Sequence, residues 1–338
     1  MITVIGATNI DIIATTQAAF VAKDSNPSKI VMSIGGVAKN YAHNLSLLGE
    51  KIQFITLFGN DYFGDVAKAE CHRLGFDIHL SDTPKDSKSS MFLCINNPGG
   101  IMQAGAADVD IVERFMTPEF LAERMHAINQ SDLVLFDANI SSDAIAYLMD
   151  HCSVPLMADT VSTKKAIRLA EALQKAQYPH LHTLKMNEVE AQYILTSPEV
   201  EVGGVKPDKD LEHVVTLLLD LGVENIYITM GEKGVYCRST TSNAVILPTL
   251  PNDNIVDTNG AGDAFLSGVA YAFLRGIVCP EAAHYGQHAA NATLSVASTV
   301  NPNLREAMLP LITHIQTYTT KDNEQISVHI TGGTESPF

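Results

Sequence analysis

A chain of 338 residues is long enough to bury a large core, and we expect one large α/β domain. Its formal net charge of −16 argues against nucleic acid polymers and anionic membranes as partners, because both would repel such a surface. The five cysteines are scattered and never spaced C-x-x-C, so neither a disulfide framework nor a zinc site is predicted, and a cytoplasmic location is expected. No apolar run reaches the roughly 18 residues that a membrane span requires.

Short apolar runs bounded by turn residues predict six strands, at residues 2–7, 53–59, 132–137, 154–159, 182–187 and 225–231. Several of these runs are apolar nearly throughout, as strands covered on both faces are, and the segments between them have helical spacing. The pattern predicts an α/β fold with a mostly parallel central sheet and helices on both of its faces. We expect residues 1–320 to form this single domain, followed by a polar C-terminal tail at residues 321–338 that lies at the edge or is partly disordered.

Two helices are predicted directly after glycines. The first follows Gly36, because Val37, Tyr41 and Leu45 would share one apolar stripe. The second follows Gly262, on the same grounds.

Two segments interrupt this alternation of strands and helices. Residues 12–34 and 87–104 read as extended chain with turns rather than as strand-helix units. We expect them to form a small β lid over one end of the domain.

The stretch DTNGAGDAFLSG, residues 257–268, carries the main chemical signal. Gly260 and Gly262 lie where a loop enters a helix, so unpaired N–H groups and the positive end of the helix dipole point at one spot, which predicts an anion site. Asp263 could there accept a proton from a hydroxyl as its oxygen attacks a phosphorus atom, and the dipole should keep the pKa of this carboxyl low. The alternative is a tight turn followed by an ordinary first-turn carboxylate.

Two common phosphate-binding motifs do not fit the chain. A P-loop of the form G-x-x-x-x-G-K-[ST] does not occur. The GAGDAF segment begins like a dinucleotide fingerprint, but Phe265 stands where the third glycine should be, so a nicotinamide enzyme is disfavoured.

Four stretches together resemble the ribokinase-like (PfkB) family of sugar and nucleoside kinases. Residues 257–265 match its C-terminal signature, roughly D-T-x-G-A-G-D-x-F, and GATNID with SIGGVAKNYAHNLSLLG, within residues 6–49, matches the N-terminal one. MNEVE at residues 186–190 is similar to the family's N-x-x-E motif, and TMGEKGV at residues 229–235 to its nucleotide-binding strand and turn. The resemblance spans essentially the whole chain and implies a ribokinase-like three-layer fold with a small β lid.

The resemblance also implies roles for individual residues. In such kinases the glycine-rich loop binds the phosphoryl group in transfer and the aspartate is the catalytic base. The corresponding catalytic residues here are Gly260, Ala261, Gly262 and Asp263.

The substrate-binding residues implied in the same way are Asn9, Asp11, Gly35, Gly36 and Asn40. Asp11 is expected at the end of the first strand, where a carboxylate can accept hydrogen bonds from two sugar hydroxyls, although an isolated aspartate there could equally cap a turn. The paired glycines would let a sugar approach the backbone, unless they only form a loop turn.

The nucleotide-binding residues implied by the resemblance are Asn187, Thr229, Gly231, Gly234 and Asn291, with Glu190 acting on a metal through water. Simpler interpretations exist for each: a solvent-facing helix start for N-x-x-E, a hairpin turn for the threonine and glycines, and a buried structural asparagine. The expected cofactors are ATP and Mg²⁺, with a monovalent cation such as K⁺ as a further candidate.

Local detail is most similar to the pseudouridine kinase branch of the family, notably the basic residue before Asn40 together with ADTVSTKKA and HTLKMNEVEA. This implies phosphorylation of a ribosyl hydroxyl, with the base packed under the lid near residues 89–91 and a homodimer formed through the lid. Ribokinase-type and adenosine kinase-type activities remain alternatives. A non-catalytic nucleotide-binding relative is a third, which retention of Asp263 disfavours.

Overall fold

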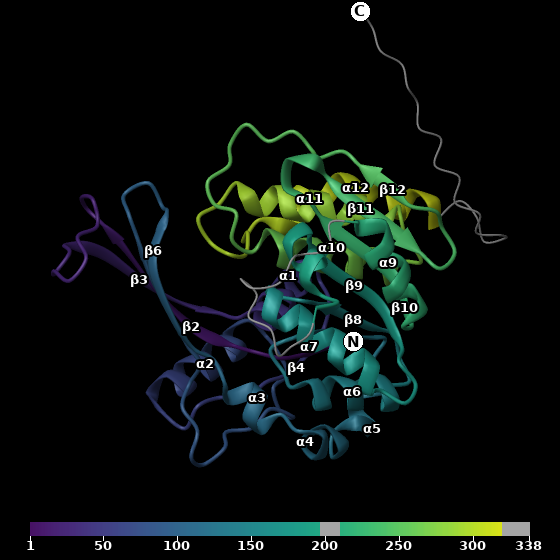
Figure 1. The fold of residues 1–338 in the computed structure, drawn as a ribbon, viewed down its shortest axis with the longest axis horizontal. Helices are drawn as coiled ribbons and strands as arrows, with labels where there is room; N and C mark the ends of the chain where they lie inside the picture. Colours follow the sequence, from purple (N-terminus) through teal and green to yellow (C-terminus); the bar gives the residue numbers. More distant parts are fainter. Residues whose placement is uncertain (197–209, 320–338) are drawn as a thin grey trace, which may run out of the picture.

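The main sheet has eight strands in the order β12-β11-β10-β9-β8-β7-β1-β4 (Figure 1). The computed structural model describes residues 1–196 and 210–319, so the tail predicted at residues 321–338 lies outside the described residues. Six neighbouring strands run parallel: β4 (Ile52–Ile55), β1 (Ile2–Ile5), β7 (Leu133–Asp137), β8 (Leu156–Asp159), β9 (Leu181–Asn187) and β10 (Val223–Thr229). Two antiparallel strands complete the edge, β11 (Val235–Ser239) and β12 (Val245–Leu247). The prediction of a mostly parallel central sheet is confirmed.

Helices cover both faces of this sheet, because its strands present apolar residues alternately to either side. In β7, Val134 and Phe136 pack into one core and Leu133 and Leu135 into the other. The first core is closed by α3 (Ile111–Phe115), α4 (Pro118–Ala122), α5 (Met125–Ile128), α6 (Ser142–His151), α7 (Thr163–Lys175), α8 (Glu188–Tyr193) and α9 (Leu211–Asp220). The second is closed by α1 (Val37–Leu47), α2 (Tyr62–Arg73), α10 (Ala261–Phe273), α11 (Ala282–Leu294) and α12 (Leu304–Thr319).

Glycines precede the two helices that were expected after them. Gly36 has φ of 99° and α1 starts at the next residue, with Tyr41 and Leu45 fully buried. Gly260 has φ of 79°, and α10 starts at Ala261, so the helix begins one residue before Gly262 rather than after it. The first turn of α10 therefore contains both Gly262 and Asp263.

A second sheet of four strands projects from the side of the main body (Figure 1). Its order is β3 (Ser28–Gly35), β2 (Asn9–Thr16), β5 (Met91–Asn96) and β6 (Met102–Asp108). We call these four strands the lid. Asn9 and Asp11 belong to lid strand β2, so the expectation that Asp11 ends the first strand is wrong.

A turn at Gly6 separates the two strands at this point. Strand β1 ends at Ile5, and Gly6 has φ of 146°. A Cβ atom there would lie 2.6 Å from Cγ of Asp137, so the close approach of this carboxylate to the backbone requires glycine. The chain leaves the main sheet here and enters the lid at Asn9.

Candidate active site

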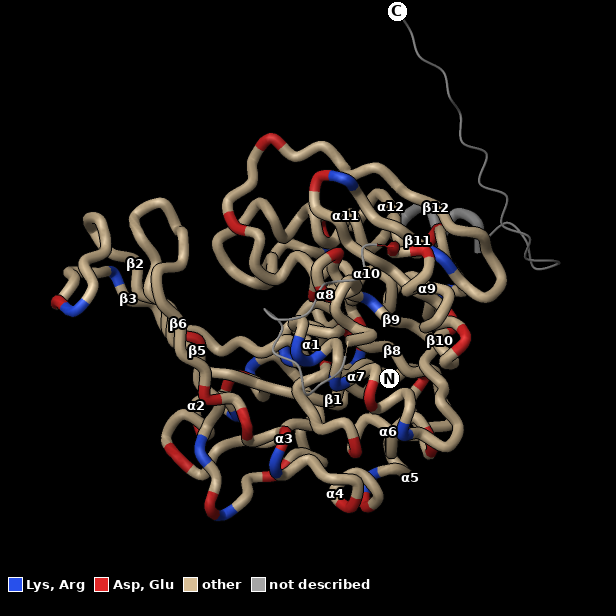
Figure 2. Tube along the Cα trace, viewed as in Figure 1, with Lys and Arg blue, Asp and Glu red and all other residues tan. Residues whose placement is uncertain are grey.

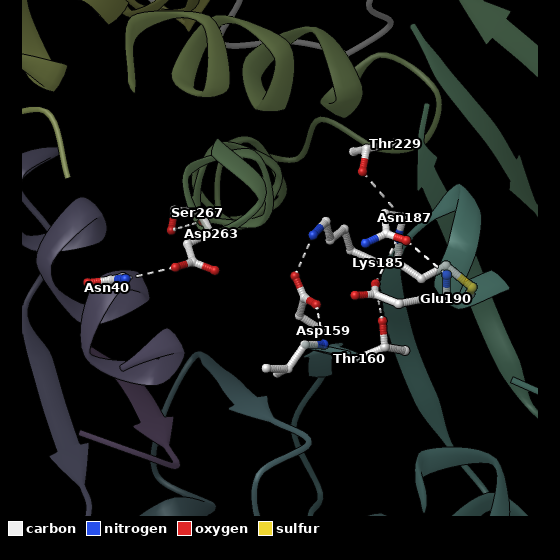
Figure 3. Close-up of polar contacts among 11 residues, drawn as sticks. Asn40, Asp159, Thr160, Lys185, Asn187, Glu190, Thr229, Asp263 and Ser267 are labelled. Atoms are coloured by element: carbon white, nitrogen blue, oxygen red, sulfur yellow. Dashed lines mark hydrogen bonds and ion pairs between the residues drawn. The ribbon is translucent and has the colours of Figure 1, made fainter. Parts of the chain in front are cut away.

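Three polar residues lie in register across the carboxyl ends of the central strands. Asp137 of β7 pairs with Asp159 of β8, and Asp159 pairs with Lys185 of β9. All three side chains are buried. The carboxyl edge of a parallel sheet is where α/β proteins bind ligands, and the first turn of α10 lies at this same edge (Figure 3).

The glycine-rich loop faces Lys185. A Cβ atom on Gly262 would lie 2.5 Å from Nζ of Lys185, so the ammonium group lies beside the backbone at the start of α10. A Cβ atom on Gly260 would lie 2.0 Å from the carbonyl oxygen of Thr299, so Gly260 is needed for the turn itself. The loop thus brings the first N–H groups of a helix and a lysine cation to one place, an arrangement suited to binding phosphate oxygens.

Lys185 forms a buried ion pair with Asp159, with 2.7 Å between Nζ and Oδ2. Burial by itself would lower the pKa of Lys185, but the charge of Asp159, followed by those of Glu190 and Asp263, raises it above its ordinary value. The site therefore contains a lysine that stays cationic. Breaking such a buried pair typically costs about 3–5 kcal/mol of folding free energy.

The turn after β8 is strained where it approaches the pair. Val161 has φ of 63°, a left-handed conformation that β-branched residues rarely adopt. Its N–H donates to Oδ1 of Asp159 at 2.7 Å. The strained turn thus holds the oxygen of Asp159 that Lys185 does not contact.

Asp263 projects from the first turn of α10 toward the same space (Figure 3). Its Oδ2 accepts a hydrogen bond from Nδ2 of Asn40 at 2.8 Å, and Oδ1 of Asn40 accepts one from the hydroxyl of Thr299 at 3.3 Å. The second bond fixes the orientation of the Asn40 amide, so that its donor side faces the carboxylate. One oxygen of Asp263 is thus held in place by α1.

The pKa of Asp263 is raised to about 7, mainly by burial and next by the charge of Asp159, against the opposing effects of Asn40 and Lys185. This corrects the expectation that the helix dipole keeps the carboxyl strongly acidic. A helix terminus contributes only about 0.3–1 kcal/mol, which is less than one pKa unit, so burial has the larger effect. A carboxylate with this pKa can take up a proton near neutral pH.

Asn187 and Glu190 form a reciprocal cap at the start of α8. Oδ1 of Asn187 accepts from the Glu190 N–H at 2.8 Å, and Oε2 of Glu190 accepts from the Asn187 N–H at 2.9 Å and from the Thr160 hydroxyl at 2.7 Å. Glu190 is only 5% exposed, so this helix start faces the interior and not the solvent. Burial, followed by the charge of Asp159, raises the pKa of Glu190.

Asp11 and the paired glycines meet at the base of the lid. A Cβ atom on Gly35 would lie 1.9 Å from Oδ2 of Asp11, so the glycine makes room for this carboxylate. Burial raises the pKa of Asp11 to about 6, and the charge of Lys39 opposes the rise. Oδ1 of Asn9 is buried without a hydrogen-bond partner among the described residues, which leaves an acceptor available to a ligand.

The predicted nucleotide-binding residues lie in three places. Thr229 ends β10 in register with Asn187 and therefore lies beside the start of α8. Gly231 and Gly234 have φ of 58° and 94° and form the turn from β10 into β11. This is the hairpin turn that was the simpler interpretation of these glycines. The side chain of Asn291 on α11 forms its hydrogen bonds with a third segment.

Asn291 is engaged instead with the loop before α10. Its Oδ1 accepts from Nδ2 of Asn252 at 2.9 Å, and its Nδ2 donates to the carbonyl oxygen of Pro251 at 3.4 Å. These contacts are what a structural asparagine would make.

Four residues of the site escaped the sequence reasoning: Asp137, Asp159, Thr160 and Lys185. A signal existed for the lysine, because HTLKMN places a cation in a strand that is covered on both faces and lies two residues before Asn187. Oδ2 of Asp137 accepts from the N–H groups of Ala7 and Ala38, at 3.1 and 3.0 Å, so it fastens the start of α1 to the sheet. Nothing local in the sequence indicates that contact.

Comparison with known proteins places this geometry in a family. The model of the pfkB family of carbohydrate kinases matches residues 1–306. The chain is 28% identical over 304 residues to a pseudouridine kinase from Escherichia coli, covering 90% of this chain and 93% of the relative. It is 26% identical over 321 residues to a guanosine-inosine kinase from Exiguobacterium acetylicum, covering 91% and 99% respectively.

Solved structures agree with the sequence comparison. A carbohydrate kinase from Agrobacterium tumefaciens superimposes with a TM-score of 0.74 at 29% identity, covering 92% of this chain and 97% of that one. The Arabidopsis thaliana ribokinase complexed with ribose and ATP superimposes with a TM-score of 0.74 at 19% identity, covering 92% and 98%. The fold is therefore ribokinase-like, and the chain belongs to the pfkB family of carbohydrate kinases, whose members transfer a phosphoryl group from ATP to a hydroxyl of a sugar or nucleoside.

Proposed function

We propose that this chain transfers the terminal phosphoryl group of ATP to the 5′-hydroxyl of pseudouridine. One observation carries the proposal. Asp263, a partly buried carboxyl with a pKa of about 7, lies in a glycine-rich helix start that faces the cation Lys185. A base matched to neutral pH beside an anion-binding loop is what phosphoryl transfer to an alcohol needs.

In the proposed reaction Asp263 accepts the proton of the substrate hydroxyl through the carboxylate oxygen that Asn40 does not hold. The O–H bond breaks, an O–P bond forms, and the bond from the terminal phosphorus to the bridging oxygen of ATP breaks, so that ADP leaves with the electron pair. The N–H groups of Gly262 and Asp263, together with Lys185, stabilise the charge on the phosphoryl oxygens. Because these groups are already in place, little reorganisation is needed during transfer.

The residues present suit magnesium held mainly by phosphate and water. No group of three or more His, Cys, Asp or Glu residues within 1–196 and 210–319 could enclose a metal ion. Buried Glu190, whose Oε2 is already occupied by Thr160 and Asn187, offers one further carboxylate oxygen. When bound, Mg²⁺ would neutralise phosphate charge, and Glu190 would orient one of its waters.

A metal titration tests this assignment. Glu190→Gln is expected to raise the Mg²⁺ concentration for half-maximal activity severalfold while the KM for the sugar substrate changes little, because the carboxamide cannot hold a water in the same way. An unchanged titration would remove Glu190 from the metal site. Replacing Na⁺ by K⁺ in the same assay tests the proposed monovalent cation.

The pseudouridine assignment is supported by the relatives and by polar groups at the base of the lid. The Escherichia coli relative, which aligns with this chain over 93% of its own length, is a pseudouridine kinase. The Ser90 hydroxyl is buried without a hydrogen-bond partner among the described residues, and it borders a small cavity. The cavity is also lined by Thr8, Ile10, Phe58, Gly59 and Ser89. We propose that the uracil ring packs beside this group, with Asn9, Asp11 and Asn40 on the ribose hydroxyls.

We further propose a homodimer formed through the lid. One lid face aligns Ile12 with Met32 and Leu93, and Ala14 with Ile30, and three of these residues are 42–67% exposed. Few charged residues lie along the lid strands (Figure 2). An exposed apolar face of this kind suits a second copy of the chain. Sedimentation of the wild type and of Ile30→Glu tests the proposal, and two monomeric species would contradict it.

The substrate experiment is a coupled ADP-release assay with pseudouridine, uridine, ribose, inosine and guanosine. We expect kcat/KM for pseudouridine to exceed that for every other compound at least tenfold. Uridine is the sharpest comparison, because only the attachment of the base differs. A preference for ribose or inosine would overturn the pseudouridine assignment and leave a kinase. ADP release with none of them, together with intact ATP binding, would instead favour a non-catalytic nucleotide-binding protein.

A further inference from the structure

Asp61 is a half-buried carboxylate that the reaction described above does not use, and it joins helix α2 to the lid. It directly precedes α2, where its Oδ1 accepts a hydrogen bond from the N–H of Gly64 at 2.9 Å and so caps the helix. The same Oδ1 accepts from the hydroxyl of Ser89 at 2.6 Å, and Oδ2 accepts from the Ser89 N–H at 2.8 Å. A helix cap needs only the first of these three contacts, so the two bonds to Ser89 serve something else.

The bonds to Ser89 are made by an ionised carboxylate. Burial by itself would raise the pKa of Asp61, but the hydrogen bonds from Ser89, Gly64 and Phe63 together hold it below its ordinary value. Hydrogen bonds to a charged acceptor are shorter and stronger than those between neutral groups. Ser89 is only 8% exposed, so water has little access to its two donors. The contact between Asp61 and Ser89 is therefore a strong one.

Two glycines let the chain come close enough for these bonds. A Cβ atom on Gly59 would lie 2.0 Å from the backbone nitrogen of Ser89. A Cβ atom on Gly64 would lie 1.9 Å from the carbonyl oxygen of Gly59. A larger residue at either position would push these segments apart. The loop at residues 59–64 therefore packs directly against Ser89.

Ser89 and Ser90 lead straight into the lid, because strand β5 begins at the next residue. The carbonyl oxygen of Ser90 accepts a hydrogen bond at 2.8 Å from the N–H of Ile10 in lid strand β2. Ile10 lies between Asn9 and Asp11, the lid residues proposed to bind the ribose. The bonds to Ser89 thus fix the end of β5 that pairs with β2 beside these two residues.

The same end of β2 is also held by a second carboxylate. Oδ2 of Asp137 accepts from the Ala7 N–H at 3.1 Å, two residues before β2 begins. Strand β2 therefore leaves the main body with one carboxylate contact before it and another beside it, through Ser90. Oδ1 of Asn9 and the Ser90 hydroxyl lie here, both buried without a hydrogen-bond partner among the described residues. Their positions depend on how this strand end is held.

We infer that Asp61 is a positioning residue for substrate binding: it holds Ser89 with both carboxylate oxygens and thereby fixes the ends of β5 and β2 where Asn9 and Asp11 lie. The inference rests on the proposed function, in which Asn9 and Asp11 bind the sugar. Asp61 acts through the backbone of Ser89 and Ser90 and does not itself touch the substrate.

The test compares Asp61→Ser and Ser89→Ala with the wild type, using pseudouridine or the best compound of the ADP-release assay. Serine caps a helix about as well as aspartate, so Asp61→Ser should keep the bond to Gly64. Its single, shorter side-chain oxygen cannot also hold both donors of Ser89. Thr117→Ala is the control, because it removes the cap of α4, where the Thr117 hydroxyl accepts from the Phe120 N–H, and leaves Asp61 in place.

In Asp61→Ser, KM for the sugar substrate should rise about tenfold while kcat falls less than about threefold, because only the sugar end is displaced. KM for ATP should stay within about twofold of wild type for the same reason. Ser89→Ala should raise KM for the sugar by about two- to threefold, since its backbone N–H still donates to Asp61.

Two further measurements separate a positioning role from a general loosening of the fold. The double variant of Asp61→Ser with Ser89→Ala should be no worse than Asp61→Ser alone, because the serine hydroxyl then has no carboxylate to meet. Thr117→Ala should lower the melting temperature and leave KM at the wild-type value. Calorimetric titration of the ATP-free enzyme with the same compound should show the loss of affinity that KM shows.

Three outcomes would overturn the inference: an unchanged KM for the sugar in folded Asp61→Ser, losses spread equally over kcat and both KM values, or the same rise in KM in Thr117→Ala. If Asp61→Ser does not fold, Asp61→Asn carries the same test. Asparagine caps equally well through its oxygen but presents an NH₂ group to a Ser89 donor.

The role of Asp61 and the proposed function fail in different ways. A wild type that neither phosphorylates nor binds any sugar or nucleoside would overturn the proposed function itself. An active wild type whose KM is unchanged by Asp61→Ser would overturn only the role of Asp61.

Discussion

The proposed phosphate end and the proposed sugar end of the site each contain a desolvated carboxylate, but the two are supported differently. Asp263 is held by a hydrogen bond from Asn40, with Asp159 and Lys185 beside it, and its pKa is about 7. Asp11 lies at the base of a projecting lid, and burial raises its pKa to about 6 against the opposing charge of Lys39. A base must gain a proton near the working pH, whereas a hydroxyl acceptor must stay ionised. The two carboxylates therefore differ in what supports them and in their proposed tasks, although burial raises the pKa of both.

The largest expected effect comes from removing the carboxylate at the phosphate end. Asp263→Asn should lower kcat by about 10² to 10⁴, because the proton acceptor is lost while the N–H groups of α10 remain. ATP binding, measured by calorimetry, should change less than threefold. A variant that keeps more than about a tenth of wild-type kcat would contradict the assignment of the base.

The wild-type enzyme should show the same group in its pH profile. Because the pKa of Asp263 is raised to about 7, kcat should be constant above this pH and fall tenfold per unit well below it. A limb near pH 4 would mean that burial does not control this carboxyl.

Lys185→Met should have the next largest effect, on both stability and rate. The change leaves Asp159 buried without its partner, which typically costs about 3–5 kcal/mol of unfolding free energy. It also removes a cation from the phosphate-binding loop, so kcat/KM should fall by about 10². Lys233→Met, which breaks an exposed pair with Glu188, is the matched control and should cost less than about 1 kcal/mol. Equal losses in the two variants would show that the buried pair has no special role.

Asp11→Asn should act on the sugar end alone. Hydrogen bonds to a charged acceptor are worth about 1.5–3 kcal/mol, so KM for the sugar should rise about 10- to 100-fold while kcat falls much less. The contrast with Asp263→Asn is the sharpest test of the comparison. A variant that loses kcat and keeps KM would mean that the roles of the two carboxylates are not divided in this way.

Backbone strain offers the smallest effect. Val161 after β8 and Lys23 in the loop between lid strands β2 and β3 are the non-glycine residues with positive φ among those described. Val161→Gly should relieve about 1–2 kcal/mol of strain, partly offset by the flexibility of glycine in the unfolded chain, for a net gain below about 1 kcal/mol. Because its N–H orients Asp159, kcat should fall two- to fivefold.

Lys23→Gly is the matched control for that change. A lysine without a branch at Cβ is less strained in this conformation, and Lys23 is exposed in the loop that joins lid strands β2 and β3. Melting temperature should rise less than in Val161→Gly, and kcat should stay at the wild-type value. A drop in kcat as large as that of Val161→Gly would argue against a local role for the strained turn.

The sequence by itself determined the features that depend on residues close together along the chain. Apolar runs and the helical spacing between them predict the six parallel strands, because the spacing of apolar residues along each element follows from which of its faces are buried. Gly36 marks one helix start as predicted, whereas the helix predicted after Gly262 begins at Ala261, directly after Gly260. The matched signatures also identify the family, and the sequence predicts Asp263 in the first turn of a helix, where it lies.

Only the tertiary structure decided which charges meet. Lys185 and Asp159 are 26 residues apart, and Asn40 and Asp263 are 223 apart, so no local pattern indicates either contact. The pKa of Asp263 contradicted the expectation from its helix, because removal of water outweighs a dipole that is visible in the sequence. Asp11 is a lid residue rather than the end of β1, since the turn at Gly6 is set by the approach of Asp137 from 131 positions along the chain. Desolvation and long-range contacts depend on how distant segments pack, and that information exists only once the chain has folded.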